Sequence, residues 1–499
     1  MGAIEGILFG FGVALSWENL LACFVGVLIG TLVGVLPGIG PLGAMALLLP
    51  STLALGPTAA LIMLCGIYYG AMYGGSTTSI LVNVPGEAAS VVTALDGYQM
   101  ARRGRAGAAL AIAAVASFVA GTLSLVGLML FAPALSELAL KFGPPEYCAL
   151  TLLGFAVLSR LTGGSLVKSA LMIALGLALG TVGMEPISGV SRFTFGSFEL
   201  SQGVDLVPLA MGLFGIAEVL ALVERRAGLP RPISVRLREL LPTRTEWRRA
   251  TGPTLRGGVL GFFVGLVPGP AAVLSSFLSY SLERRLSRHP EEFGHGAVEG
   301  VAGPEAANNG ATGGALVPLL ALGIPFAPAT AMLLGALILH GVQPGPLLMV
   351  QRPEMFWGVV ASMYIGNVFL LILNLPFIGL FVRLLRLPQT WLLPIVVLLC
   401  LVGTYAVSNS MVDLWVLTIA GVAGWALRKF GFEPALIVLA LVLGPILEKT
   451  FRQTLIMTRG DLGMMAERPI TVGLLLFALA VVLAPALAAG LRRLRSAPA

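Results

Sequence analysis

Apolar stretches of about 20 residues, the length a helix needs to cross a bilayer, alternate with short polar stretches along nearly the whole chain. They recur from the first residues almost to Gly490, and no separate soluble domain interrupts them. A segment within a bilayer must satisfy its backbone hydrogen bonds internally, which favours helices. We therefore expect an all-α, polytopic membrane protein with about 11–12 transmembrane segments plus re-entrant or broken helices.

The stretch Tyr68–Ser90 departs from this pattern, because it lies between apolar segments yet reads YYGAMYGGSTTSILVNVPGEAAS. Small and polar residues followed by Pro-Gly-Glu are not typical of a helix that faces lipid. Non-helical backbone at membrane depth survives only where it is buried in protein or lines a wet cavity. We expect this stretch to be one half of a buried, non-helical binding site.

Glycine and proline recur in two segments, GVLIGTLVGVLPGIG and GGVLGFFVGLVPGPA. Five positions match at an offset of 231: Gly26, Gly30, Gly34, Pro37 and Gly38, with Gly257, Gly261, Gly265, Pro268 and Gly269. Further along, Gly74 and Pro85 match Gly314 and Pro325 at an offset of 240, and the extra residues fit the polar loop RLSRHPEEFGHGAVEG. The chain therefore contains an internal repeat.

The repeat predicts two homologous transmembrane halves, residues 1–225 and 257–490. Residues 226–256 form a basic linker between them, and 491–499 form a short tail. Repeats with broken helices near the membrane midplane are the common plan of secondary transporters, in which substrate and coupling ions bind at the repeat interface. We favour an inverted orientation of the two halves.

The matched Gly rows lie on one helix face, and each row then meets Pro-Gly, which should end or kink the helix. Carbonyl groups at such breaks can coordinate a hard cation such as sodium. An acid at membrane depth is also a functional candidate, and Glu305 lies directly before Ala-Ala-Asn-Asn. The candidate ion-coupling residues are Pro37, Gly38, Pro268, Gly269, Glu305 and Asn308.

Neutral hydroxyl and amide groups gather near both breaks and suit a carboxylate, since amides and hydroxyls can hold an anion without Arg. The candidate substrate-binding residues are Ser76, Thr77, Thr78, Asn83, Pro85 and Gly86 in the first half, and Asn308, Asn309, Thr312, Pro325 and Phe326 in the second. The competing interpretation is that each hydroxyl only bonds its own helix or a neighbouring helix. Two further acids, Glu87 and Asp96, are expected at the aqueous interface.

Composition agrees with a membrane protein, because 57% of the residues are hydrophobic and only 11% are charged, against about 25% charged in soluble domains. The net charge of +7 does not indicate nucleic acid, because the basic residues lie between apolar segments. The segment from Glu224 through Arg256 contains nine Arg, and the tail carries Arg492, Arg493 and Arg495. The positive-inside tendency places both regions in the cytoplasm.

Catalytic and metal-binding motifs are not found in the sequence, and its four Cys are scattered singly in apolar surroundings. We therefore expect no catalytic residue, no metal and no cofactor beyond a coupling ion. Two other functions stay open. One is a membrane-embedded enzyme that uses Glu305 or Asp96 as acid or base, and the other is a membrane protein whose repeats only pack helices.

Several long motifs, in order along essentially the whole chain, resemble the large membrane subunit of the tripartite tricarboxylate transporters of bacteria. They include GVLPGIGPLGAMALLLPSTLALGP, YYGAMYGGSTTSILVNVPGEAASVVTALDGYQMARRGRAGAAL, EEFGHGAVEGVAGPEAANNGATGGALVPLLALGIP and LGPILEKTFRQTLIMTRGDL. The resemblance implies an inner-membrane permease that imports a small carboxylate, driven by a sodium or proton gradient. It also implies two partners, a small membrane subunit of about four spans and a periplasmic solute-binding protein.

The chain departs from the family pattern at two places. Pro325 is followed by Phe326 where the family usually has Pro-Gly, and Pro268-Gly269 is followed by Pro270-Ala271 where the family tends to have Ala-Gly. A bulky Phe326 at a cavity wall would favour an acid other than citrate, one with an apolar part.

Overall fold

The computed structural model describes residues 2–36, 40–161, 165–185, 188–224, 233, 237–384 and 389–495. The part of the chain that the structure describes is 81% helical. In the described part, the only strands are β1 (Gly183–Met184) and β2 (Ser191–Arg192), which pair antiparallel. The all-α fold predicted from the apolar pattern is therefore confirmed.

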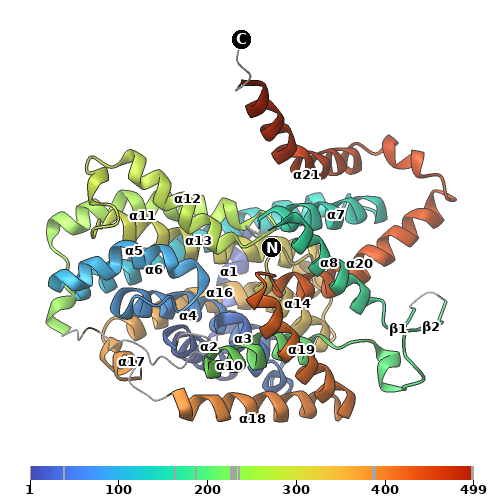
Figure 1. Cartoon of the computed structure of the whole chain (residues 1–499), viewed down its shortest axis with the longest axis horizontal. Coiled ribbons are helices and arrows are strands. Elements are labelled where there is room, and N and C mark those ends of the chain that lie inside the picture. Colours follow the sequence, from blue (N-terminus) through green and yellow to red (C-terminus); the bar gives the residue numbers. More distant parts are fainter. Residues whose placement is uncertain are drawn as a thin grey trace. The chain divides into compact units, whose positions relative to one another are not determined.

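The helices divide between two compact units. Unit 1 comprises residues 1–137, 207–267 and 271–426, and unit 2 comprises residues 138–206, 268–270 and 427–499. The helices that lie wholly or mainly in unit 1 are α1 (Ala3–Ala14), α2 (Trp17–Val35), α3 (Gly40–Leu48), α4 (Pro57–Val82), α5 (Val91–Met100), α6 (Ala106–Ala139), α9 (Leu206–Ala210), α10 (Ala217–Glu224), α11 (Arg244–Gly265), α12 (Ala271–Leu286), α13 (Glu299–Leu322), α14 (Pro328–Leu339), α15 (Leu348–Gln351), α16 (Pro353–Asn374), α17 (Ile378–Leu384), α18 (Gln389–Ser408) and α19 (Met411–Lys429) (Figure 1).

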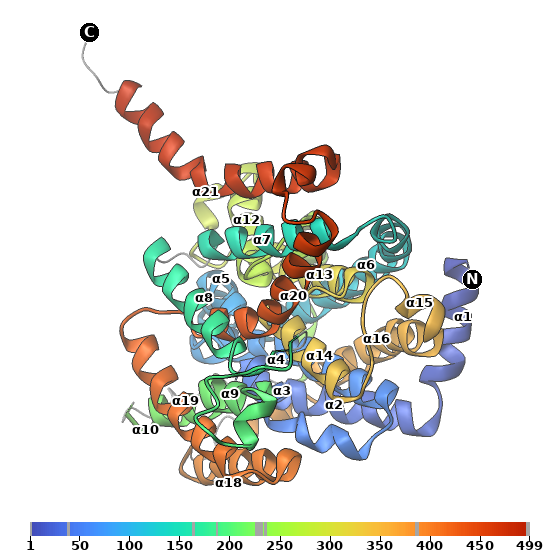
Figure 2. The ribbon, with the colours of Figure 1, turned by 90° about the vertical axis from the view of Figure 1, so that its right-hand side faces the viewer.

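Unit 2 contains the helices α7 (Pro144–Leu161), α8 (Leu166–Gly180), α20 (Ala435–Met457) and α21 (Pro469–Arg495). Figure 2 shows α8 beside α20, and these two helices pack against each other. The short β1–β2 hairpin belongs to the same unit and is tied to α20, because Arg192 donates to Glu448 at 2.7 Å.

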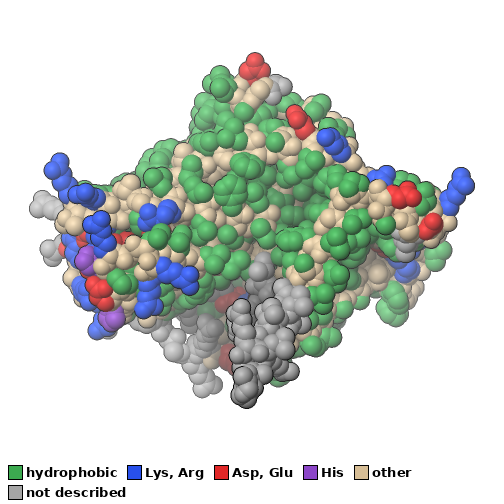
Figure 3. All heavy atoms as spheres, turned by 90° about the horizontal axis from the view of Figure 1, so that it is seen from above, with side chains coloured by type: hydrophobic (Ala, Val, Ile, Leu, Met, Phe, Trp, Pro, Cys, Tyr) green, Lys and Arg blue, Asp and Glu red, His purple; other side chains and the backbone are tan. Residues whose placement is uncertain are grey.

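Six helical segments among the described residues are long and apolar enough to cross a membrane: Trp17–Val35, Pro57–Val82, Ala88–Ala139, Leu206–Glu224, Pro353–Asn374 and Met411–Lys429. Shorter apolar helices accompany them. Figure 3 shows a face on which hydrophobic side chains predominate, with a group of Lys, Arg and His side chains at its left-hand edge. The chain is thus a multi-pass membrane protein, and the count of about 11–12 spans stays a prediction.

The Gly rows bring two pairs of helices into close contact, α2 with α4 and α11 with α13. A Cβ atom on Gly30 would lie 2.5 Å from the carbonyl oxygen of Ile67, and one on Gly261 would lie 2.1 Å from that of Ala307. Ordinary van der Waals contact is longer, so only glycine permits these backbones to approach. The partner residues Ile67 and Ala307 are 240 positions apart, the same spacing as Gly74 and Gly314 in the sequence.

The two central helices also end alike. Asn83 follows α4 with φ 58° and Gly323 follows α13 with φ 73°, both in the left-handed conformation that commonly ends a helix. These two residues are also 240 positions apart. This matched packing agrees with a duplicated unit, while the common origin and the relative orientation of the halves stay predictions.

The helices extend further than the sequence pattern predicted. Ser76, Thr77 and Thr78 lie within α4, and Asn308 and Asn309 lie within α13, so the expectation of a non-helical polar stretch is wrong for these residues. Packing explains the difference, because buried hydroxyls can donate to carbonyls of their own helix without breaking it. Only the short segments after Val82 and Leu322 leave the helical conformation.

Candidate functional site

The carboxylate of Glu305 is the centre of a buried polar cluster in unit 1. Glu305 lies on α13 and its side chain is 1% exposed. Ser76 on α4 donates to its Oε2 at 2.6 Å, and Thr93 on α5 donates to its Oε1. Two consecutive helices, α4 and α5, therefore meet the distant helix α13 at one carboxylate.

Ser117 on α6 adds a third hydroxyl to the cluster, 3.5 Å from Oε2 of Glu305. The Asn309 amide donates to Ser117 at 2.7 Å and to the backbone carbonyl of Glu305 at 3.0 Å. Because Ser117 already accepts from Asn309, its own proton is free to point at Glu305. We call these five residues, Ser76, Thr93, Ser117, Glu305 and Asn309, the Glu305 cluster.

A second buried acid, Glu87, lies next to this cluster. Glu87 caps the short 3₁₀-helix η2 (Ala88–Ser90), where its Oε2 accepts from the backbone N–H of Ala89 at 2.6 Å. Its Oε1 accepts from the amide of Asn308 on α13 at 3.2 Å. The side-chain oxygen of Asn308 is buried and makes no hydrogen bond. Glu87 is 8% exposed and so is buried within the protein, while its expected place at the aqueous interface of the membrane stays a prediction.

No basic side chain in the described part of the chain forms an ion pair with Glu87 or Glu305. Burying an unpaired charge costs on the order of several kcal/mol, even after the protein around it relaxes. Hydroxyl and amide donors lower that cost but do not supply opposite charge. The arrangement therefore attracts a cation or a proton.

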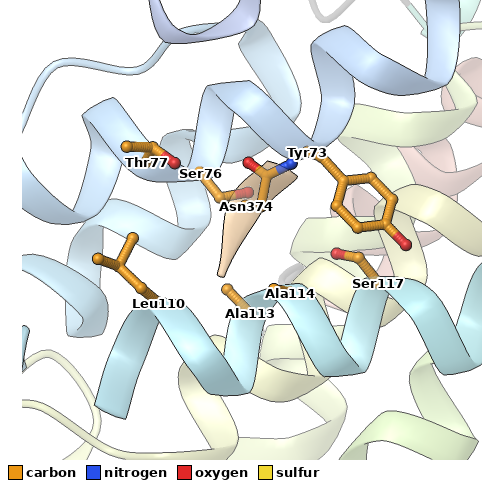
Figure 4. Close-up of a pocket in the computed structure, with 8 residues that line it drawn as sticks. All are labelled: Tyr73, Ser76, Thr77, Leu110, Ala113, Ala114, Ser117 and Asn374. Atoms are coloured by element: carbon orange, nitrogen blue, oxygen red, sulfur yellow. The ribbon is translucent and has the colours of Figure 1, made fainter. Parts of the chain in front are cut away.

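A small pocket opens beside the cluster (Figure 4). It is lined by Tyr73, Ser76 and Thr77 of α4, by Leu110, Ala113, Ala114 and Ser117 of α6, and by Asn374 at the end of α16. Its atom-free space is at most about 230 Å³, which is below the roughly 300–1,000 Å³ of ordinary ligand pockets. In this conformation it suits an ion or water better than a whole tricarboxylate.

Asp96 is a third buried acid, and its hydrogen bonds connect elements of the fold. It is fully buried, and it accepts from the Tyr280 hydroxyl at 2.9 Å and from the backbone N–H groups of Gly296 and Ala297 at 2.7 and 2.8 Å. Its expected place at the aqueous interface stays a prediction. The Tyr280 hydroxyl attaches α5 to α12, and the two backbone donors attach α5 to the segment that leads into α13.

The predicted site residues are distributed as follows. Ser76, Asn309 and Glu305 belong to the Glu305 cluster, Thr77 lines the pocket, and Asn308 contacts Glu87. Thr78 donates to the carbonyl of Gly75 and Thr312 to that of Asn308, so both satisfy their own helices. Asn83 is exposed, while Pro85 and Gly86 lie between α4 and η2, and Pro325 and Phe326 lie buried between α13 and α14.

Of the two predicted Pro-Gly breaks, only the second lies within the described residues. Pro37 and Gly38 lie outside the described residues. Pro268 and Gly269 lie between α11 and α12, where the helix is interrupted as expected, and they group with unit 2.

The sequence did not predict Thr93, Ser117 and Asn374 as site residues, and it did not predict that Glu87 is buried against Asn308. Thr93 precedes Asp96 by one helical turn in TALDG, and Glu87 directly follows Pro-Gly. Asp96 and the Pro-Gly pair were therefore the sequence features that could have indicated Thr93 and Glu87. Ser117 and Asn374 lie in ordinary apolar helices, so only their neighbours in space reveal them.

Comparison with known proteins gives one family match and two relatives. A model of the tripartite tricarboxylate transporter TctA family matches residues 20–439. An uncharacterized 52.8 kDa protein from the TAR-I ttuC' 3' region of Agrobacterium vitis is 49% identical over 486 residues, or 97% of this chain and 96% of that protein. An uncharacterized protein from the TAR-II ttuC' 3' region of the same organism is 47% identical over 215 residues, or 43% of this chain and 89% of that protein. No solved structure matches.

Proposed function

The chain belongs to the tripartite tricarboxylate transporter TctA family, and from this premise we propose that it imports a small di- or tricarboxylate, coupled to a sodium or proton gradient. It is a component of a tripartite transporter. Its partners would be a periplasmic solute-binding protein that delivers the substrate and a small membrane subunit of about four spans. Its place would be the bacterial inner membrane, with the basic linker and the tail in the cytoplasm.

The observation that carries this proposal is the buried Glu305 carboxylate, which accepts hydrogen bonds from α4 and α5 and has no ion pair among the described residues. An ionisable residue inside a membrane protein commonly marks an ion or substrate pathway. Hydroxyl donors hold the charged carboxylate in place, and a cation or proton then neutralises it.

Coupling follows from the sign of the charges. Glu305 and Glu87 are both acids, so in their charged forms they repel an anionic substrate at close range. A cation or proton at these acids removes that repulsion. The substrate then binds well only to the cation-loaded state, which is the differential affinity that coupled transport requires.

Transport is favoured over acid–base catalysis by what surrounds the two acids proposed for an enzyme. The Asp96 carboxylate is occupied by two backbone donors and a tyrosine. Around Glu305 the hydrogen-bonding side chains are hydroxyls, and these titrate far from neutral pH. Among the described residues, neither carboxylate is hydrogen-bonded to a histidine or a lysine, the side chains best suited to proton transfer near neutral pH.

The test is uptake by the reconstituted complex. Vesicles that contain this chain, the small subunit and the binding protein should accumulate labelled di- or tricarboxylate only under a sodium or proton gradient. Glu305→Gln keeps the size of the side chain and should abolish accumulation. Glu199→Gln changes an acid in an exposed segment and should leave uptake unchanged. Accumulation without any ion gradient, or in the Glu305→Gln variant, would refute the proposal.

A further inference from the structure

The small pocket beside the Glu305 cluster contains a buried polar atom without a partner. Asn374 is 4% exposed, and its side-chain oxygen makes no hydrogen bond. Its amide nitrogen donates to the carbonyl of Leu370 at 2.9 Å. This bond fixes the orientation of the amide, because a flipped Asn374 would bring two oxygens together. A bare carbonyl oxygen is therefore presented at the pocket.

The other polar groups of the pocket are also oxygens. Ser76, Thr77 and Ser117 are 5%, 2% and 1% exposed, and their hydroxyls line the pocket together with Asn374. Figure 4 shows Ser76 and Asn374 together on one side, with Ala113 and Ala114 of α6 facing them. Oxygen ligands of this kind suit a hard cation.

Two sources of negative potential act on the same pocket. The pocket-lining hydroxyls of Ser76 and Ser117 both contact Oε2 of Glu305, so a full negative charge lies one hydrogen bond away. Asn374 is also the last residue of α16, and the C-terminal end of a helix carries a partial negative charge. Both favour a cation over a neutral water molecule and disfavour an anion.

The number of charges indicates a monovalent ion. Glu305 is the one carboxylate that contacts the pocket-lining hydroxyls, and no group of three His, Cys, Asp or Glu able to hold a metal occurs among the residues described. Calcium and magnesium sites in proteins usually use several carboxylates or phosphates. A proton alone would leave the amide oxygen of Asn374 without a donor.

We propose that this pocket is a sodium site, with Asn374, Ser76, Thr77 and Ser117 supplying oxygen ligands and Glu305 supplying the balancing charge. The proposal rests on the proposed function and specifies its coupling ion. It also assigns a role to α16, which the sequence pattern left as an ordinary apolar helix. Sodium would then join α4, α6 and α16 to the carboxylate on α13.

The experiment measures the unfolding temperature of the purified full-length chain in sodium, potassium and choline chloride at equal ionic strength. A ligand that binds the folded state raises this temperature by mass action. We expect stabilisation by sodium in the wild type. Asn374→Leu should weaken the apparent sodium affinity at least about tenfold, comparable with the loss of a group that orients a metal ligand. Asn374→Asp keeps an oxygen at the pocket but turns its second oxygen toward the carbonyl of Leu370, so it should lower the unfolding temperature and still retain the response to sodium.

Asn19→Leu is the matched control, because Asn19 is also buried and also donates its amide to a backbone carbonyl, that of Val13. It should lower stability without changing the response to sodium. If the wild type unfolds at one temperature in all three salts, the pocket holds a water only and the proposal is wrong. An unchanged sodium response in Asn374→Leu is equally decisive against it.

Uptake separates this proposal from the function on which it rests. Carboxylate accumulation driven by a proton gradient alone, with no effect of sodium on unfolding, would reject the sodium site and leave carboxylate transport standing. Sodium stabilisation without carboxylate uptake under any gradient would reject the transport function and leave the site standing.

Discussion

The hydroxyl of Ser76 donates to the carboxylate of Glu305 at 2.6 Å, although the two residues are 229 positions apart. The bond joins α4 of the first half to α13 of the second half. A hydrogen bond to a charged group contributes roughly 1.5–3 kcal/mol. This contact therefore links the two predicted repeats at the carboxylate that we expect to balance the charge of the coupling ion.

Removing this donor should weaken the site without unfolding the protein. We expect Ser76→Ala to lower apparent cation affinity in uptake assays by about tenfold to a hundredfold, while Ser76→Thr retains part of it. Ser79→Ala is the control on the same helix, since Ser79 donates to the Gly75 carbonyl and to Ser90 instead. Equal effects of Ser76→Ala and Ser79→Ala would contradict the assignment.

Glu87 and Asn308 should act as a pair, because they are in contact at 3.2 Å. Residues in direct contact show coupling energies of about 0.5–3 kcal/mol in double-mutant cycles. We expect the effects of Glu87→Gln and Asn308→Leu on the unfolding temperature and on uptake to be non-additive. The combination of Glu87→Gln with Asn19→Leu should be additive, and additivity in both combinations would argue against the pair.

The Gly rows should tolerate no added methyl group. We expect Gly30→Ala and Gly261→Ala to destabilise the protein by about 1–3 kcal/mol or more, because the new Cβ meets backbone atoms that cannot move aside easily. Both changes should be equally severe, since the helix pairs match. Gly12→Ala in α1 has open space around it and should be neutral or slightly stabilising through helix propensity. Differential scanning fluorimetry on the three variants checks this.

Acid should weaken the contact between α11 and the segment before α6. Burial opposes ionisation of Glu246, but hydrogen bonds from Arg105 and Thr243 outweigh it and hold the pKa of Glu246 below its usual value. A carboxylate with a lowered folded-state pKa stabilises the fold above its unfolded pKa, and this contribution is lost as the pH falls through the folded-state pKa. The difference in unfolding temperature between wild type and Glu246→Gln should therefore shrink on acidification. A difference in unfolding temperature that does not change with pH would show that the charge of Glu246 does not contribute to stability.

Several residues of the site could be predicted from the local sequence. The full set of residues that form the Glu305 cluster and the pocket could not. The acid at Glu305 and the polar residues Ser76 and Asn309 stand out because they are unusual within apolar segments. Thr93, Ser117 and Asn374 do not stand out, because one hydroxyl or amide in a helix is common and its neighbours depend on how helices pack. Thr312 shows the converse, since it stands out equally but donates to the carbonyl of Asn308.

The sequence by itself determined that the chain is helical and crosses the membrane, that Gly rows recur at offsets of 231 and 240, and that Glu305 is an unusual acid. These features follow from local composition and periodicity. Only the tertiary structure decided that the polar residues of α4 and α13 stay helical and that Glu87 is buried. It alone also placed Asn374 beside Ser76. The physical reason is that helix periodicity predicts which face of a helix is buried, whereas the partner of that face depends on the packing of helices far apart in the chain.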